Sequence, residues 1–267
     1  MKNLSSIYAA AFKVMVLQQL QHRAELFIWL NSRIIDPLMY LVIWNVIAQA
    51  QKGSVDGFSP GDFAAYYLIS MLVSSLTYTA IMWEYTYRIT NGMLSALLLR
   101  PLHPIHTDFV ETIVNKLLIL LVLLPVTGIL IVMFHPTFHI RFWGVLAFFP
   151  ALLAAFVLRF LLEWMLAMAA FWFTRITAIN LLYSALLTFF SGSFAPLTLL
   201  PNPLPQLSML LPFRWIISFP VELITERLPR SAILFGFFAQ AAWLLLLLGC
   251  LTLLWHHALQ KYTAVGL

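Results

Sequence analysis

Long apolar stretches alternate with short polar connections along this chain. Five of the stretches hold about 20 or more mostly apolar residues, enough for a helix rising 1.5 Å per residue to cross a hydrocarbon layer of about 30 Å. A sixth stretch is also long enough but carries Arg33 and Asp36. The pattern predicts six membrane-spanning helices, at residues 26–48, 63–83, 109–134, 150–173, 177–199 and 232–255.

Composition supports a membrane environment. The chain is 62% hydrophobic and 9% charged, with a mean hydropathy of +0.92, whereas soluble domains average about 25% charged residues. Backbone groups in lipid need internal partners, which leaves helices or closed barrels, and the apolar runs are too long for barrel strands. The sequence therefore predicts a single all-α polytopic membrane domain over residues 1–267, with a function in transport, channel activity or intramembrane chemistry.

The charges give a weak orientation. A net charge of +5 without any basic run argues against nucleic-acid binding. Lys and Arg favour cytoplasmic loops, and a mild excess is expected inside when both termini are cytoplasmic. The basic residues expected inside are Lys2, Lys13, Arg23, Arg88, Arg100, Arg175 and Lys261, against Lys52, Arg141, Arg214, Arg227 and Arg230 outside.

Three segments between or before the spans are predicted to be helical without crossing the membrane. Residues 1–24 mix apolar and polar positions, as a helix lying at the cytoplasmic interface does. Residues 84–107 are amphipathic at helical spacing, and Arg100-Pro101 ends that segment. The proline-rich stretch 196–231 is too apolar for a free loop and too interrupted for one span, which predicts short re-entrant or interfacial helices.

Two charged pairs fall inside predicted spans. Arg159 and Glu163 are four residues apart on one helical face, and Arg33 and Asp36 are three apart, so each pair is expected to interact. Charges at membrane depth must face protein or water. Each pair could line a pathway or could fix the packing of the spans, and the pattern does not choose between these roles.

The sequence gives little support for catalysis or metal binding by this chain. The histidine pairs, His103 with His106 and His135 with His139, lack a third ligand at a suitable spacing, so solvated histidines near loop ends are expected instead. A nucleophile elbow is absent, and so is the phosphate-binding motif of nucleotide-hydrolysing domains. If transport uses ATP, another chain must hydrolyse it.

Several runs of residues, taken in order, resemble the membrane-spanning subunits of type-2 ABC transporters, the bacterial ABC exporter permeases. The resemblance covers nearly the whole chain. The runs are residues 17–23 (LQQLQHR), 88–104 (RITNGMLSALLLRPLHP), 194–197 (FAPL), 211–214 (LPFR) and 259–266 (LQKYTAVG).

The resemblance implies a permease of the bacterial inner membrane that pairs with a second, identical or related permease and binds ABC ATPase subunits. The chain itself would bind no cofactor, and ATP with Mg would bind the partner ATPase. Residues 84–104 would form the cytoplasmic coupling helix, and 196–231 the outer re-entrant region. The residues expected to couple to the ATPase are Glu84, Arg88, Gly92, Arg100 and Pro101, and those of the outer region are Pro196, Pro212 and Arg214.

A rival hypothesis is an ion-gradient-driven secondary transporter or channel, in which Glu163 or Asp36 would be a proton or ion site. It predicts transport without any ATPase. Low-charge, aromatic-rich spans suit a hydrophobic or amphipathic cargo, although Trp and Tyr also anchor spans at interfaces.

Overall fold

The computed structural model describes most of the chain as helix, without strands among the described residues. The predicted interfacial helix at 1–24 lies mostly outside the described residues, although 12–17 are helical. Pro101 also lies outside them. The described residues are 8, 12–17, 21, 23–51, 53–100, 103–173 and 176–261.

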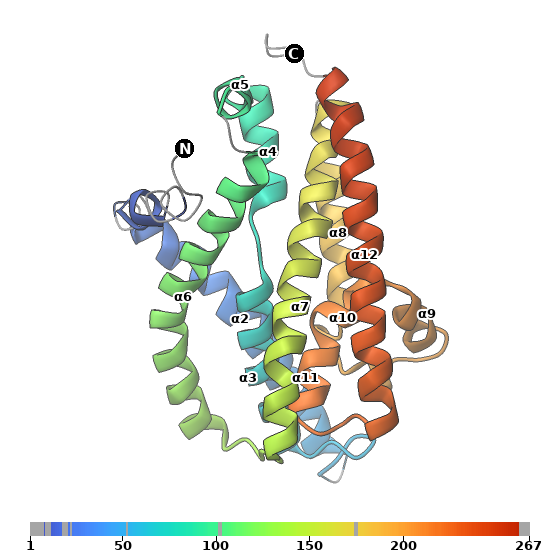
Figure 1. Ribbon diagram of the computed structural model, residues 1–267. Helices are drawn as coiled ribbons and strands as arrows, with labels where there is room; N and C mark the ends of the chain where they lie inside the picture. Colours follow the sequence, from blue (N-terminus) through green and yellow to red (C-terminus); the bar gives the residue numbers. More distant parts are fainter. Residues whose placement is uncertain are drawn as a thin grey trace.

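The longer helices form an elongated bundle in which α7 is central (Figure 1). It packs against α12, α3, α4 and α11, while α2 packs on α3. The short helix α5 and the C-terminal end of α12 lie at one end of the bundle, and the 51–59 loop lies at the other. The longer helices are α2 (Arg23–Ala50), α3 (Pro60–Thr77), α6 (Pro104–Phe134), α7 (Phe142–Ala167), α8 (Thr177–Phe190) and α12 (Arg230–Lys261).

Four helical stretches among the described residues are long and apolar enough to cross a membrane. They coincide with the second, third, fourth and sixth predicted spans, and the 3₁₀ turn η1 (Met168–Phe171) extends α7. The first predicted span coincides with α2, a helix of 28 residues. The six-span topology as a whole stays a prediction. The four stretches are Pro60–Ile89, Pro104–Phe134, Phe142–Phe171 and Arg230–Lys261.

The fifth helix is shorter than predicted. The apolar run favoured a helix to residue 199, but α8 ends at Phe190 after 14 residues. Gly192 follows with φ of +86°, a conformation that glycine adopts without strain. A Cβ at Gly192 would also lie 2.7 Å from the Tyr66 hydroxyl. At 1.5 Å per residue α8 spans about 21 Å, less than the hydrocarbon thickness.

The second predicted span is interrupted in its middle. Its first half, α3, begins with a capping box in which Ser59 and Asp62 satisfy each other's backbone N–H groups. The helix ends at Thr77, residues 78–80 are extended or irregular, and α4 (Ile81–Thr90) resumes the direction of the chain. The sequence pattern did not indicate this break.

The predicted coupling segment is two short helices rather than one. After α4 the chain turns at residues 91–93, where Gly92 has φ of +66°, and then forms α5 (Leu94–Leu98). The amide of Met93 donates to the carbonyl of Arg88 and closes the turn. Glycine permits this left-handed position, so helix α4 ends here despite the continuing amphipathic pattern.

Short helical pieces form where the proline-rich stretch predicted them. Pro212 begins one of them at its first turn, where the missing N–H has no cost. That these pieces re-enter the membrane stays a prediction. The pieces are η2 (Leu197–Leu199), α9 (Leu204–Leu210), α10 (Pro212–Ile216) and α11 (Ser218–Ile224).

Close packing between α11 and α12 gives a testable expectation at Gly236. A Cβ placed there would lie 2.0 Å from a ring carbon of Phe219, whereas a Cβ at Gly249, in the same helix, meets nothing within 4 Å. We expect Gly236→Ala to lower the free energy of unfolding by about 1–3 kcal/mol through overpacking. Gly249→Ala is the matched control and should be neutral or mildly stabilising, since alanine favours helix. Denaturant titration of the purified protein measures both, and equal values would contradict this packing.

Candidate functional site

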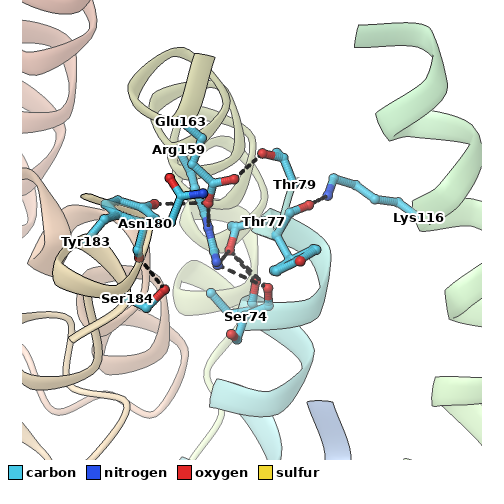
Figure 2. Close-up of polar contacts among 11 residues, drawn as sticks. Ser74, Thr77, Thr79, Lys116, Arg159, Glu163, Asn180, Tyr183 and Ser184 are labelled. Atoms are coloured by element: carbon cyan, nitrogen blue, oxygen red, sulfur yellow. Dashed lines mark hydrogen bonds and ion pairs between the residues drawn. The ribbon is translucent and has the colours of Figure 1, made fainter. Parts of the chain in front are cut away.

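A buried ion pair lies at the centre of the bundle. The Nε of Arg159 donates to Oε1 of Glu163 over 2.7 Å, one turn apart on α7. The two residues are only 4% and 3% exposed. The pair expected from their spacing is therefore present, and Figure 2 shows it between α7, α8 and the broken helix α3–α4.

Hydroxyl groups from helix α8 and from the break after α3 complete the hydrogen bonding of Glu163 (Figure 2). The Tyr183 hydroxyl on α8 donates to Oε1 over 3.0 Å, and the Thr79 hydroxyl donates to Oε2. Arg159 also donates to the Thr77 hydroxyl over 3.3 Å. A buried charge needs such partners because desolvation otherwise makes it costly. The pair thus ties three segments of the bundle together.

The end of α3 and the break that follows it supply backbone acceptors to two basic side chains. Lys116 on α6 donates to the carbonyl of Tyr78 over 2.5 Å, and Arg159 reaches the carbonyl of Ser74 at 3.5 Å. The C-terminal end of a helix carries partial negative charge. Irregular backbone at membrane depth is tolerated where protein surrounds it. Backbone carbonyls of α3 and the break thus hold the side chains of Lys116 and Arg159 in addition to the contact of Arg159 with Glu163.

Arg33 does not pair with Asp36 as expected. Its guanidinium lies over the ring of Tyr78, 3.8 Å from the centroid, and that of Arg159 lies 5.2 Å from the same centroid. Among the described residues no ion pair joins Asp36 to a basic group, and Asp36 is exposed. Tyr78 thus separates the buried pair from an open groove.

That groove lies between α2, α3 and α8, with a volume of about 290 Å³. Eight of its eleven lining residues carry a polar or charged group, among them two charges of opposite sign and several hydroxyls. On another face of α2, a shallow and open apolar hollow is lined by Ile35, Leu38, Met39, Val42 and Ile43. The polar groove is lined by Arg33, Asp36, Pro37, Tyr40, Ser70, Ser74, Tyr78, Leu187, Thr188, Ser193 and Ile217.

A second ion cluster holds the predicted coupling segment against α6. Arg88 lies 2.5 Å from Asp108, 2.8 Å from Glu84 and 3.3 Å from Glu111. The indole N–H of Trp164 on α7 donates to the other oxygen of Asp108 over 2.9 Å. Arg88 was expected to face the ATPase, but its side chain is largely buried and joins α4 to α6 and, through Asp108, to α7.

His103 caps α6 and is not a solvated loop histidine. Its Nδ1 accepts from the amide of Ile105 over 3.2 Å, and its ring lies 4.5 Å from that of Trp255 and 5.6 Å from that of Trp164. Burial lowers the pKa of His103, and the neighbouring His106 lowers it further. A neutral ring is what the capping bond requires, because Nδ1 must accept. Within the described ranges no group of three or more His, Cys, Asp or Glu is arranged to hold a metal.

A third cluster organises the proline-rich region at residues 196–231. Arg214 donates to Glu222 over 2.8 Å, and the Ser218 hydroxyl donates to the other oxygen of Glu222 over 2.5 Å. The hydroxyls of Tyr66 and Tyr67 on α3 donate to backbone carbonyls of the turn after α8. Pro196 and Pro212 begin or precede short pieces in this region, so Arg214 acts within the fold.

A family model described as ABC-2 family transporter protein matches residues 34–266. The chain belongs to the ABC-2 transporter family. The resemblance seen in the sequence is thereby confirmed. This ABC-2 transporter chain is a permease component of an ABC transporter, a multi-pass membrane protein, and the family associates with ABC ATPase subunits. A comparison with curated proteins found no match.

Some site residues of this ABC-2 transporter were not identified from its sequence. No role was predicted for Asp108, Glu222, Thr79 or Tyr183. Their partners lie 4 to 84 positions away in the chain. A signal existed for Asp108, since an acidic residue inside an apolar helix demands a cation. None existed for Thr79, because hydroxyl residues are common in membrane helices.

Proposed function

We propose that this ABC-2 permease is half of an ATP-driven exporter. Two permease subunits would form the pathway, and separate ATPase subunits would hydrolyse ATP with Mg. The chain would lie in the bacterial inner membrane with α5 and both termini on the cytoplasmic side. The polar groove between α2, α3 and α8 is the part of each subunit that faces the pathway in this proposal.

The observation that carries the proposal is the α4–α5 segment. It stands at one end of the bundle (Figure 1) and presents Leu99, which is 88% exposed, and Arg100, which is also exposed. The cluster around Arg88 attaches it to α6 and α7. An exposed apolar residue beside a charged one is better suited to contact with a partner protein than to exposure to water. A segment held this firmly would transmit movement of an ATPase to the long helices.

We expect Leu99→Glu to weaken association with the ATPase subunit at least tenfold, because an unpaired carboxylate would be buried at the contact. Leu99→Met, which keeps an apolar side chain, should bind as the wild type does. Gln51→Glu adds the same charge to an exposed site at the opposite end of the bundle and serves as the control. Co-purification of the permease with its co-expressed ATPase measures the effect.

The same preparations distinguish the ion-gradient hypothesis. Transport by the permease reconstituted alone in vesicles, driven by a proton or sodium gradient, would contradict the proposal. Loss of ATPase binding in Gln51→Glu rather than Leu99→Glu would place the ATPase at the other end and would contradict the assignment of α5.

A further inference from the structure

The polar groove holds two opposite charges that do not neutralise each other. Arg33 and Asp36 lie one helical turn apart on α2, a spacing at which such residues ordinarily pair. Here Arg33 is drawn onto the ring of Tyr78 at 3.8 Å, and Asp36 is left exposed on the groove wall. Ionised groups at membrane depth are costly unless protein, water or a ligand satisfies them.

Three helices supply hydroxyls around these charges. Ser70 and Ser74 on α3, Thr188 on α8 and Tyr40 on α2 all line the groove. Serine and threonine hydroxyls both donate and accept hydrogen bonds. The volume of about 290 Å³ is near the lower end of small-ligand sites, which hold about 300–1,000 Å³. The recess therefore fits a small polar group with a positive and a negative end.

The apolar hollow on the same helix is a separate surface. It is lined by Ile35, Leu38, Met39, Val42 and Ile43. At about 100° per residue these positions project from the side of α2 away from Arg33, Asp36 and Tyr40. The hollow is therefore not part of the groove.

We propose that the groove binds a membrane amphiphile with a zwitterionic headgroup, whose anionic group faces Arg33 and whose cationic group faces Asp36. Its acyl chain extends from the groove into the surrounding lipid. This proposal rests on the transport function proposed above and adds the class of cargo. The hydroxyls bind the ester oxygens beside the anionic phosphate.

Binding to the purified full-length permease in a non-ionic detergent tests the headgroup. The probes are phosphatidylethanolamine, phosphatidylglycerol and diacylglycerol with one identical pyrene-labelled acyl chain, followed by energy transfer from tryptophan. The wild type is expected to prefer phosphatidylethanolamine to phosphatidylglycerol about tenfold and to bind diacylglycerol least, since charge-assisted contacts are the strong ones.

Asp36 and Arg33 should each control the preference between a different pair of probes. Asp36→Asn removes the preference for phosphatidylethanolamine over phosphatidylglycerol but keeps that of phosphatidylglycerol over diacylglycerol. Arg33→Gln removes the preference for phosphatidylglycerol over diacylglycerol but keeps that of phosphatidylethanolamine over phosphatidylglycerol. Asp36→Glu retains the wild-type order. Asp56→Asn and Arg230→Gln, exposed positions outside the groove, are charge-matched controls. A general folding defect would weaken both headgroup preferences in the same variant. Loss of only one preference in each variant is therefore specific to the charge that was removed.

Several results would overturn the proposal. Equal binding of the three probes would remove the headgroup site, and tightest binding of phosphatidylglycerol would make it an anion site. Loss of dimers in both groove variants with unchanged headgroup preference would assign the charges to a contact between subunits. ATPase association is measured on the same variants: if it persists while headgroup preference is absent, only the cargo inference fails. If the wild type binds no ATPase, the exporter proposal fails instead.

Discussion

Arg88→Gln is expected to lower the free energy of unfolding by about 3–5 kcal/mol, the range for removing one partner of a buried ion pair. The Asp108 side chain is only 1% exposed, and without Arg88 it keeps just the N–H of Trp164 as a described partner. Removing Arg88 thus leaves a desolvated carboxylate without a counter-charge. Denaturant titration of the purified permease measures the loss.

The other two carboxylates of this cluster provide matched controls. The side chains of Glu84 and Glu111 are 40% and 29% exposed, so water screens their attraction to Arg88. We expect Glu84→Gln to change stability by no more than about 1 kcal/mol and Glu111→Gln to lie between the two. The double variant Arg88→Gln with Asp108→Asn should recover much of the loss, because no buried charge remains.

Within this series, the variants that lose most stability should also lose most of the coupling between ATP hydrolysis and transport. In the complex with its ATPase, Arg88→Gln is expected to hydrolyse ATP with little transport, since α4 and α5 would no longer be fixed to α6 and α7. Arg88→Lys should be intermediate, because an ammonium group cannot match the fork that contacts three carboxylates. Equal stability and transport in Arg88→Gln and Glu84→Gln would contradict this account of the cluster.

The lengths of the apolar runs predicted where the long helices lie but not where they are interrupted. The length of an apolar run is set by the lipid, so α6, α7 and α12 were found from composition alone. The break at residues 78–80 depends instead on Thr79 meeting Glu163 and on Lys116 meeting the carbonyl of Tyr78. These are contacts between segments, and no local pattern carries them.

The candidate site shows the same division between local and distant contacts. The Arg159–Glu163 pair follows from helical spacing and is present, whereas the equally local Arg33–Asp36 pair is replaced by stacking on Tyr78. The aromatic ring of another helix competes there with the nearby carboxylate. Arg88 lies on the predicted segment 84–104, as its position requires. Its side chain points into the bundle because it contacts Asp108, which only the packing of α4 on α6 brings within reach.

The structure also bears on the two roles left open for Arg159 and Glu163. Both side chains are buried behind Tyr78, and neither lines the polar groove. The hydrogen-bond partners of the pair lie on α7, α8, the end of α3 and the break after it. This arrangement favours a structural ion pair over a pathway-lining one.

Glu163→Ala is therefore expected to lower the free energy of unfolding by about 3–5 kcal/mol, because Arg159 loses its counter-charge and Tyr183 and Thr79 lose their acceptor. Arg159→Met should cost a similar amount by leaving Glu163 uncompensated. The double variant Arg159→Met with Glu163→Gln removes both charges and keeps an amide oxygen for the two hydroxyls. We expect it to recover most of the stability, and a double-mutant cycle gives the coupling free energy.

Transport by the double variant then separates the two roles. A structural pair predicts that transport with the ATPase returns together with stability, because nothing in the groove has changed. If the double variant regained stability but transported no cargo, the charges themselves would be needed for movement, and the pair would belong to the pathway. Asn180→Asp, which adds a charge to a buried position on the adjacent helix, should lower stability without any recovery and shows what an uncompensated charge costs at this depth.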